Sequence, residues 1–136
     1  FLKESFVGAE NKILELQSSA QNLKTSGTCC CIALIRRNRC FIANLGNSRA
    51  VLCRETLVND CQAIELSRDH SLKNKYEKRR IVKKGGKVRK QGGPVDRFWV
   101  DESGPGLTAT RALGGNEYKQ LGLSDEPDIE VLDLIQ

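Results

Sequence analysis

The chain has 136 residues, the size of one domain, with the composition of an ordinary globular protein and a formal net charge of +5. It contains no run of about 18 apolar residues, the length that a membrane-spanning helix needs. Its first residues also lack the basic-then-apolar pattern of a secretion signal, so we expect neither feature. Because the chain has no methionine, we expect it to be part of a longer protein.

An amphipathic helix is predicted at the start of the chain. Apolar residues recur there every three or four positions, which is the period of one helix face. The predicted helix covers residues 1–18, and its expected buried stripe is Leu2, Phe6, Ala9, Ile13 and Leu16.

Short apolar runs separated by polar turns come next and predict strands. Three of them, 28–35, 39–45 and 49–53, follow one another closely enough to indicate an antiparallel meander. The first run is apolar on both faces, so we expect it to be a central, covered strand. A fourth strand is expected at 63–66.

The second half of the chain alternates less regularly. A helix is predicted over 71–84, with Asp69 as its cap and the glycine pair at 85–86 as its end. Short strands are expected at Val88 and 98–100, around a turn at 92–94, and a last strand at 129–135. Strands in succession, with helices at intervals, predict an α+β layered fold.

Six cysteines are placed in a way that argues against a disulfide framework. Cys29, Cys30 and Cys31 are consecutive in an apolar run, and Cys40 and Cys53 also fall in predicted strands. No Cys-x-x-Cys pair is present and there is one histidine, so a structural zinc site is not expected. We therefore expect reduced, buried cysteines and an intracellular protein, cytoplasmic or nuclear.

The positive charge is concentrated in one segment. Residues 73–90 contain ten Lys or Arg and a single acid, Glu77. Such a segment can bind nucleic acid, an anionic membrane, or a phosphorylated or acidic protein. It has one aromatic residue and no stacking platform, which argues against nucleic acid. If it is more than a solvated helix face, we expect a protein partner and contacts through Lys83, Lys84 and Lys87.

A series of motifs runs through the chain in a fixed order. It consists of Ser26-Gly27-Thr28, residues 42–52 with Asn44-Leu45-Gly46-Asn47-Ser48-Arg49-Ala50, Leu66-Ser67-Arg68-Asp69-His70, Glu77 with Arg80-Ile81 and Gly85-Gly86-x-Val88, Arg97-Phe98-Trp99, residues 106–114 with Thr110-Arg111-Ala112-Leu113-Gly114, and Glu126-Pro127-Asp128-Ile129. Together these motifs resemble the type-2C, metal-dependent serine/threonine protein phosphatase family. The resemblance covers 1–136 as a single partial domain, about the middle half of a family domain.

The resemblance implies an α-β-β-α sandwich of antiparallel sheets with flanking helices, incomplete in this chain. It also implies a pair of Mn²⁺ or Mg²⁺ ions and a bridging water that attacks a phosphoserine or phosphothreonine. Two close divalent ions activate such a water and neutralise the developing phosphoryl charge. In the family, the outer motifs that carry the main metal ligands would lie before residue 1 and after residue 136.

Two motif positions depart from the family. Where the family has an Asp in Gly-Asp-Ser-Arg, this chain has Asn47, and where it has one in Leu-Gly-Asp, this chain has Gly115. Neither replacement supplies the negatively charged oxygen that hard dications prefer. We therefore predict no catalytic residue, metal ligand or cofactor in this chain.

Three further polar residues have two interpretations each. Arg49 and Arg111 could contact a phosphate bidentately, but an arginine in such a motif more often pairs with a buried carboxylate. His70 could act as a general base, which requires a nearby nucleophile. We favour a structural role for all three.

The sequence predicts, as its first hypothesis, an inactive type-2C phosphatase-like segment that acts in protein binding or regulation, with a phosphorylated or acidic protein as partner. The alternative is a fragment of an active Mn- or Mg-dependent phosphoserine/phosphothreonine phosphatase. A second alternative is a binder of nucleic acid or anionic membrane through its basic segment. The sequence leaves the oligomeric state open.

Overall fold

The computed structural model describes residues 1–20, 23–55, 60–90, 93–100 and 104–134. Its helices are α1 (Leu2–Ser19), α2 (Lys75–Lys83) and α3 (Asn116–Lys119). Its strands are β1 (Gly27–Thr28), β2 (Cys30–Arg36), β3 (Arg39–Leu45), β4 (Val51–Glu55), β5 (Cys61–Glu65), β6 (Lys87–Lys90), β7 (Asp96–Trp99), β8 (Leu113–Gly114) and β9 (Asp128–Asp133). No helix among these residues is both long enough and apolar enough to cross a bilayer.

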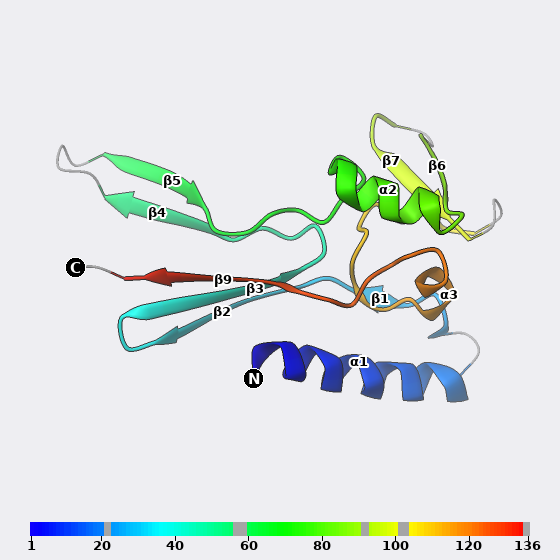
Figure 1. The fold of residues 1–136 in the computed structure, drawn as a ribbon, viewed down its shortest axis with the longest axis horizontal. Helices are drawn as coiled ribbons and strands as arrows, with labels where there is room; N and C mark the ends of the chain where they lie inside the picture. The colour runs from blue at the N-terminus through cyan, green and yellow to red at the C-terminus, as the bar shows by residue number, and fades with distance from the viewer. Residues whose placement is uncertain (21–22, 56–59, 91–92, 101–103, 135–136) are drawn as a thin grey trace.

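The strands form antiparallel ladders in the order β1–β8, β2–β3–β9, β4–β5 and β6–β7. Helix α1 lies along one side of the β2–β3–β9 sheet, and α2 lies beside the β6–β7 hairpin (Figure 1). Helices and antiparallel sheets in this succession confirm the predicted α+β class.

The described residues form two apolar cores. One lies between α1 and the three-stranded sheet and consists of Phe6, Ala43, Leu45 and Leu113. The other lies under α2 and contains Leu72, Ile81, Phe98, Ala112, Tyr118 and Leu123. In the second core, the rings of Phe98 and Tyr118 meet edge to face, with centroids 5.8 Å apart. This core holds α2, which carries Glu77 and Arg80, against the motif segment at 106–114.

The prediction that strand 28–35 is central was wrong. Strand β3 is central, pairing with β2 on one side and β9 on the other, and β2 is an edge strand of the described sheet. Most of β2 is exposed, including Ile35 at 65%. An apolar run shows that the side chains of a strand can be buried, but it does not show that another layer covers both faces of that strand.

The predicted meander was correct for its first two strands and wrong for its third. Strands β2 and β3 form a hairpin from Cys30↔Leu45 to Arg36↔Arg39. Strand β4 pairs with β5 instead of β3. Gly46 (φ 110°) turns the chain out of the sheet after β3, so β9 takes that edge of β3.

Helix α1 was predicted at nearly its observed length, but its buried face differs. Ala9 and Leu16 are exposed, whereas Glu10 and Gln17 are buried. Glu10 accepts a hydrogen bond from Gly114 N–H at 2.7 Å and forms an ion pair with Lys119 at 2.8 Å. These partners stabilise a buried carboxylate that a purely apolar stripe would not include.

The second helix starts later than the predicted residue 71. Its N-cap is Asn74, whose side chain accepts a hydrogen bond from Tyr76 N–H at 3.0 Å. Asp69 is therefore not the cap. The short strands expected at Val88 and 98–100 correspond to β6 and β7. Gly92 in the expected turn, and the end of the strand predicted at 129–135, lie outside the described residues.

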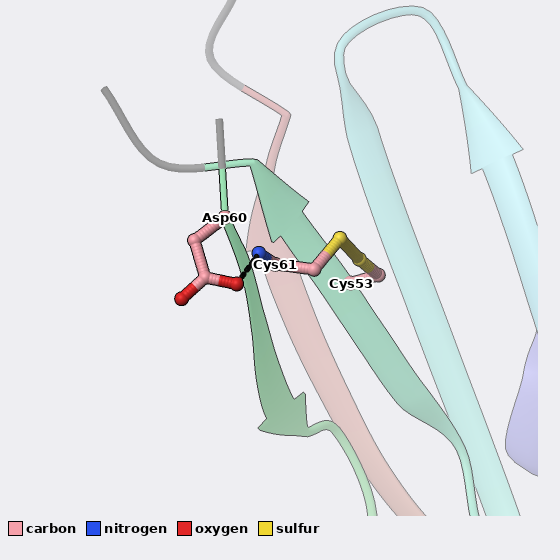
Figure 2. Close-up of a disulfide and its surroundings, with 3 residues drawn as sticks. All are labelled: Cys53, Asp60 and Cys61. Carbon is pink, nitrogen blue, oxygen red and sulfur yellow. Dashed lines mark hydrogen bonds between the residues drawn. A yellow bond between two sulfur atoms is a disulfide. The ribbon is translucent and has the colours of Figure 1, made fainter. Parts of the chain in front are cut away.

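The expectation of six reduced, buried cysteines was also wrong. Cys53 of β4 and Cys61 of β5 form a disulfide across the hairpin (Figure 2). Cys40 is buried, but Cys29 and Cys30 are half-buried and Cys31 is exposed. Two strands paired in register bring cysteines eight residues apart together, which the sequence pattern alone did not show. The argument for an intracellular location from cysteine usage loses its support.

Candidate functional site

The turn after β3 sets the position of Asn47. Gly46 has a φ of 110°, and a Cβ there would lie 2.2 Å from Cys29 Sγ, so only glycine fits. The turn leaves Asn47 exposed. The Cys29 thiol donates to Asn47 Oδ1 and the Asn47 amide donates to Thr108 Oγ1, both at 3.4 Å. The neutral amide therefore joins two segments that are far apart in the sequence.

Asn47 lines a cleft of about 510 Å³. The cleft lies between the turn after β3, the segment before α2, and the β6–β7 hairpin. Its lining residues are Asn47, Asp69, Ser71, Leu72, Lys73, Lys90, Pro94, Val95, Asp96 and Thr108. We take this cleft as the candidate functional site because it contains Asn47.

Gly115 lies elsewhere. It is buried, has φ 65° and ψ 45°, and precedes α3. Its N–H donates to the Ser26 carbonyl at 2.7 Å, and a Cβ on it would lie 2.9 Å from Leu123 Cδ2. Gly115 does not line the cleft, so the two positions that lack the family's acid are not brought together around it.

Arg111 lies in a largely buried ion-pair network centred on Glu77. Its guanidinium is 2.8 Å from a Glu77 oxygen and 2.9 Å from Asp128 Oδ1. Glu77 also accepts two hydrogen bonds from Arg80 and one from the Thr110 hydroxyl at 2.6 Å. Burial alone would raise the pKa of Glu77, but these hydrogen bonds lower it to about 2.

Arg49 also pairs with carboxylates of this chain. It donates two hydrogen bonds to Asp69, at 3.0 and 2.9 Å, and one to Glu65 at 2.8 Å. The hydrogen bonds from Arg49 hold the pKa of Asp69 below its usual value. Both motif arginines are thus occupied by internal acids.

His70 is buried between two fixed partners. Its Nδ1 accepts the N–H of Gly46 at 3.0 Å, and its Nε2 lies 3.0 Å from Asp128 Oδ2. This arrangement requires the proton on Nε2. Within the described residues no nucleophile bonds to either nitrogen, so the imidazole connects the β3 turn to β9.

The lysines that the sequence singled out lie away from the cleft. Lys83 ends α2, Lys84 is its C-cap, Lys87 begins β6, and all three are exposed. The cleft instead takes Lys73 and Lys90 from the two ends of the basic segment. Sequence reasoning missed both, although the charge of that segment was the available signal.

Among the described residues, no three His, Cys, Asp or Glu side chains gather closely enough to hold a metal ion. Asp69, which lines the cleft with Asn47, and Glu77 and Asp128, which contact Arg111, are already bound to arginine or histidine.

Comparison with known proteins identifies the class. The Protein phosphatase 2C family model matches residues 1–135. Probable protein phosphatase 2C 21 of Arabidopsis thaliana is 36% identical over 118 residues, 81% of this chain and 29% of that protein. The integrin-linked kinase-associated serine/threonine phosphatase 2C of Homo sapiens is 33% identical over 129 residues, 94% of this chain and 30% of that protein.

A solved structure agrees. The serine-threonine phosphatase 2C from Toxoplasma gondii matches with a TM-score of 0.85 and 25% identity, over 98% of this chain and 45% of that one. The chain belongs to the protein phosphatase 2C family, as the motifs predicted. The match confirms the predicted fold class, and the chain spans about a third of these curated relatives.

Proposed function

We propose that this chain is a partial type-2C phosphatase domain, over residues 1–136, that binds phosphorylated protein and regulates it without hydrolysing it. The observation that carries the proposal is the chemistry at the two motif positions. Asn47 presents an amide, already bonded to Cys29 and Thr108, and Gly115 presents only backbone.

The physical argument concerns the cost of dehydrating a dication. Mg²⁺ loses its water shell reluctantly and is held mainly through carboxylates and phosphates. An amide oxygen carries no net charge and is a weaker ligand. Asp69 pairs with Arg49 and Glu77 pairs with Arg111, so releasing either acid for a metal would break an ion pair.

One alternative is that the chain is a fragment of an active Mn- or Mg-dependent phosphatase. Its support is that the curated relatives are named phosphatases and are about three times longer than the matched segment. Metal ligands contributed by other parts of such a protein could then suffice. The second alternative, a binder of nucleic acid or anionic membrane, has the exposed Lys83, Lys84 and Lys87 as its support.

The test is calorimetric titration of the chain with Mn²⁺, together with phosphate release from a phosphoserine peptide. The expected result is no tight metal binding and no turnover, in this chain and in the Asn47→Asp/Gly115→Asp double variant. Binding of two ions per chain, or turnover that depends on Mn²⁺, would instead establish the active alternative. Binding to an oligonucleotide or to anionic vesicles that falls steeply with added salt would favour the second one.

A further inference from the structure

We propose that the cleft beside Asn47 is a binding site for a phosphate monoester on a peptide, and that it works without a divalent cation. This inference rests on the proposed function and assigns it a place on the molecule. The site includes the motif residues Asn47, Asp69 and Thr108, but its two cations, Lys73 and Lys90, belong to no family motif identified in the chain.

The first argument is charge. The acids in the cleft wall, Asp69 and Asp96, already accept hydrogen bonds from Arg49 and from Lys78, the latter at 2.9 Å. Neither Arg49 nor Lys78 lines the cleft. The hydrogen bonds from Arg49 and Lys78 lower the pKa values of these acids, and Lys73 and Lys90 lie close enough to lower them further.

Within the described part of the chain, however, Lys73 and Lys90 form no ion pair with these acids or with any other. Glu65, the second acid on Arg49, is outside the cleft lining and mostly exposed. The cleft therefore offers two ammonium groups to an incoming anion.

The second argument is the set of neutral donors. The Asn47 amide and the Thr108 hydroxyl lie 3.4 Å apart and line the cleft with the Ser71 hydroxyl. A phosphate monoester has three acceptor oxygens and nearly two negative charges at neutral pH. Ammonium groups supply the charge attraction, and amide and hydroxyl groups supply directed hydrogen bonds to the remaining oxygens.

The third argument is the residue at position 47. A carboxylate there would repel a phosphate dianion and would have no proton to donate to it. The amide has nearly the same shape, carries no charge and donates two hydrogens. The replacement that removes a metal-type ligand thus removes an obstacle to binding phosphate directly.

The fourth argument is that the wall also has apolar surface. Leu72, Pro94 and Val95 line the cleft, and Val95 is 45% exposed. These groups can contact the aliphatic part of a phosphorylated residue and its neighbours, so a peptide gains more than an inorganic ion does.

The experiment measures fluorescence anisotropy of a labelled phosphoserine peptide with the chain in EDTA, beside the same peptide carrying serine or glutamate. The phosphopeptide is expected to bind at least ten-fold more tightly than either. Asn47→Asp and the Lys73→Gln/Lys90→Gln pair should each weaken it at least ten-fold. The Lys3→Gln/Lys12→Gln pair removes the same charge from exposed positions of α1 outside the cleft and should change affinity less than two-fold. Urea midpoints establish that each variant is folded.

The inference is overturned if the phosphopeptide fails to bind saturably, if the cleft variants bind like the original chain, or if Mn²⁺ is needed. Equal affinity for inorganic phosphate would reduce the site to a free-anion site, and competition by an oligonucleotide would assign it to phosphodiesters.

A parallel measurement in the presence of Mn²⁺ follows the release of phosphate from the same phosphopeptide. Turnover sinks the proposed function, whereas a phosphopeptide that binds without turnover, and binds the cleft variants equally well, sinks this inference alone.

Discussion

The Arg111 guanidinium lies 2.8 Å from a carboxylate oxygen of Glu77, although 34 residues separate them in the sequence. The Glu77 side chain is 3% exposed and that of Arg111 is 16% exposed. Arg80 and Thr110 complete the network, which joins α2, the segment before β8, and the start of β9 through Asp128. A charge this deeply buried is stable only while its partners remain in place.

Replacing Glu77 by Gln should therefore destabilise the protein by about 3 kcal/mol, because it leaves Arg80 and Arg111 without their shared counter-charge. Urea denaturation measures the change in unfolding free energy. Glu15→Gln is the matched control, since Glu15 is an exposed partner of Lys12, and its cost should be about 0.5 kcal/mol or less. A loss below about 1 kcal/mol for Glu77→Gln would contradict the assigned role.

The ionisation of Glu77 should make the stability of the protein depend on pH. The pKa of Glu77 falls from 4.5 to about 2 on folding, so the folded state favours its ionised form. This contribution, about 3 kcal/mol, is fully present above about pH 4.5 and is lost as pH falls toward 2. Unfolding free energies between pH 2 and 6 should show it, and Glu77→Gln should flatten that slope. An unchanged slope would place the acid sensitivity in other groups.

The Cys53–Cys61 disulfide closes a short loop and should stabilise the β4–β5 hairpin by about 2 kcal/mol. Alkylation of the unfolded, unreduced chain should label Cys29, Cys30, Cys31 and Cys40, with the remaining pair labelled only after reduction. Cys53→Ser should raise amide hydrogen exchange in β4 and β5, while exchange in β3 stays constant. Six reactive thiols before reduction would show that the bridge is absent.

Two glycine substitutions should have opposite effects. Gly46→Ala places a Cβ against Cys29 at a φ of 110°, and should cost about 2 kcal/mol or more. Gly8 lies inside α1 with no atom within 4 Å of an added Cβ, so Gly8→Ala should stabilise by about 0.5–1 kcal/mol. Thermal unfolding of both variants checks the pair. Equal effects of the two substitutions would mean that the turn after β3 tolerates an added Cβ.

Features that depend on local sequence were predictable. Three features follow from residues that are close together in the chain: the helical period of α1, the end of α2 at a glycine pair, and the β2–β3 hairpin. The family motifs indicated the fold class, and they also directed attention to Asn47 and Gly115.

Features that depend on long-range pairing were not predictable. Three such features each require partners that only the whole fold brings together. They are the pairing of β3 with β9 instead of β4, the disulfide, and the burial of Glu10. The cleft is the same kind of feature, because Lys73 and Lys90 come from separate elements and meet only when the β6–β7 hairpin folds back beside the segment before α2.

Strand β2 also bears on how the polypeptide behaves at high concentration. Among the described residues no strand pairs with its second edge, and Ile32, Leu34, Ile35 and the Cys31 thiol are exposed on this strand. Backbone groups on such an edge can accept a strand from another molecule, and the adjacent thiol can then crosslink the two covalently. Purification at low protein concentration should therefore give the most homogeneous sample.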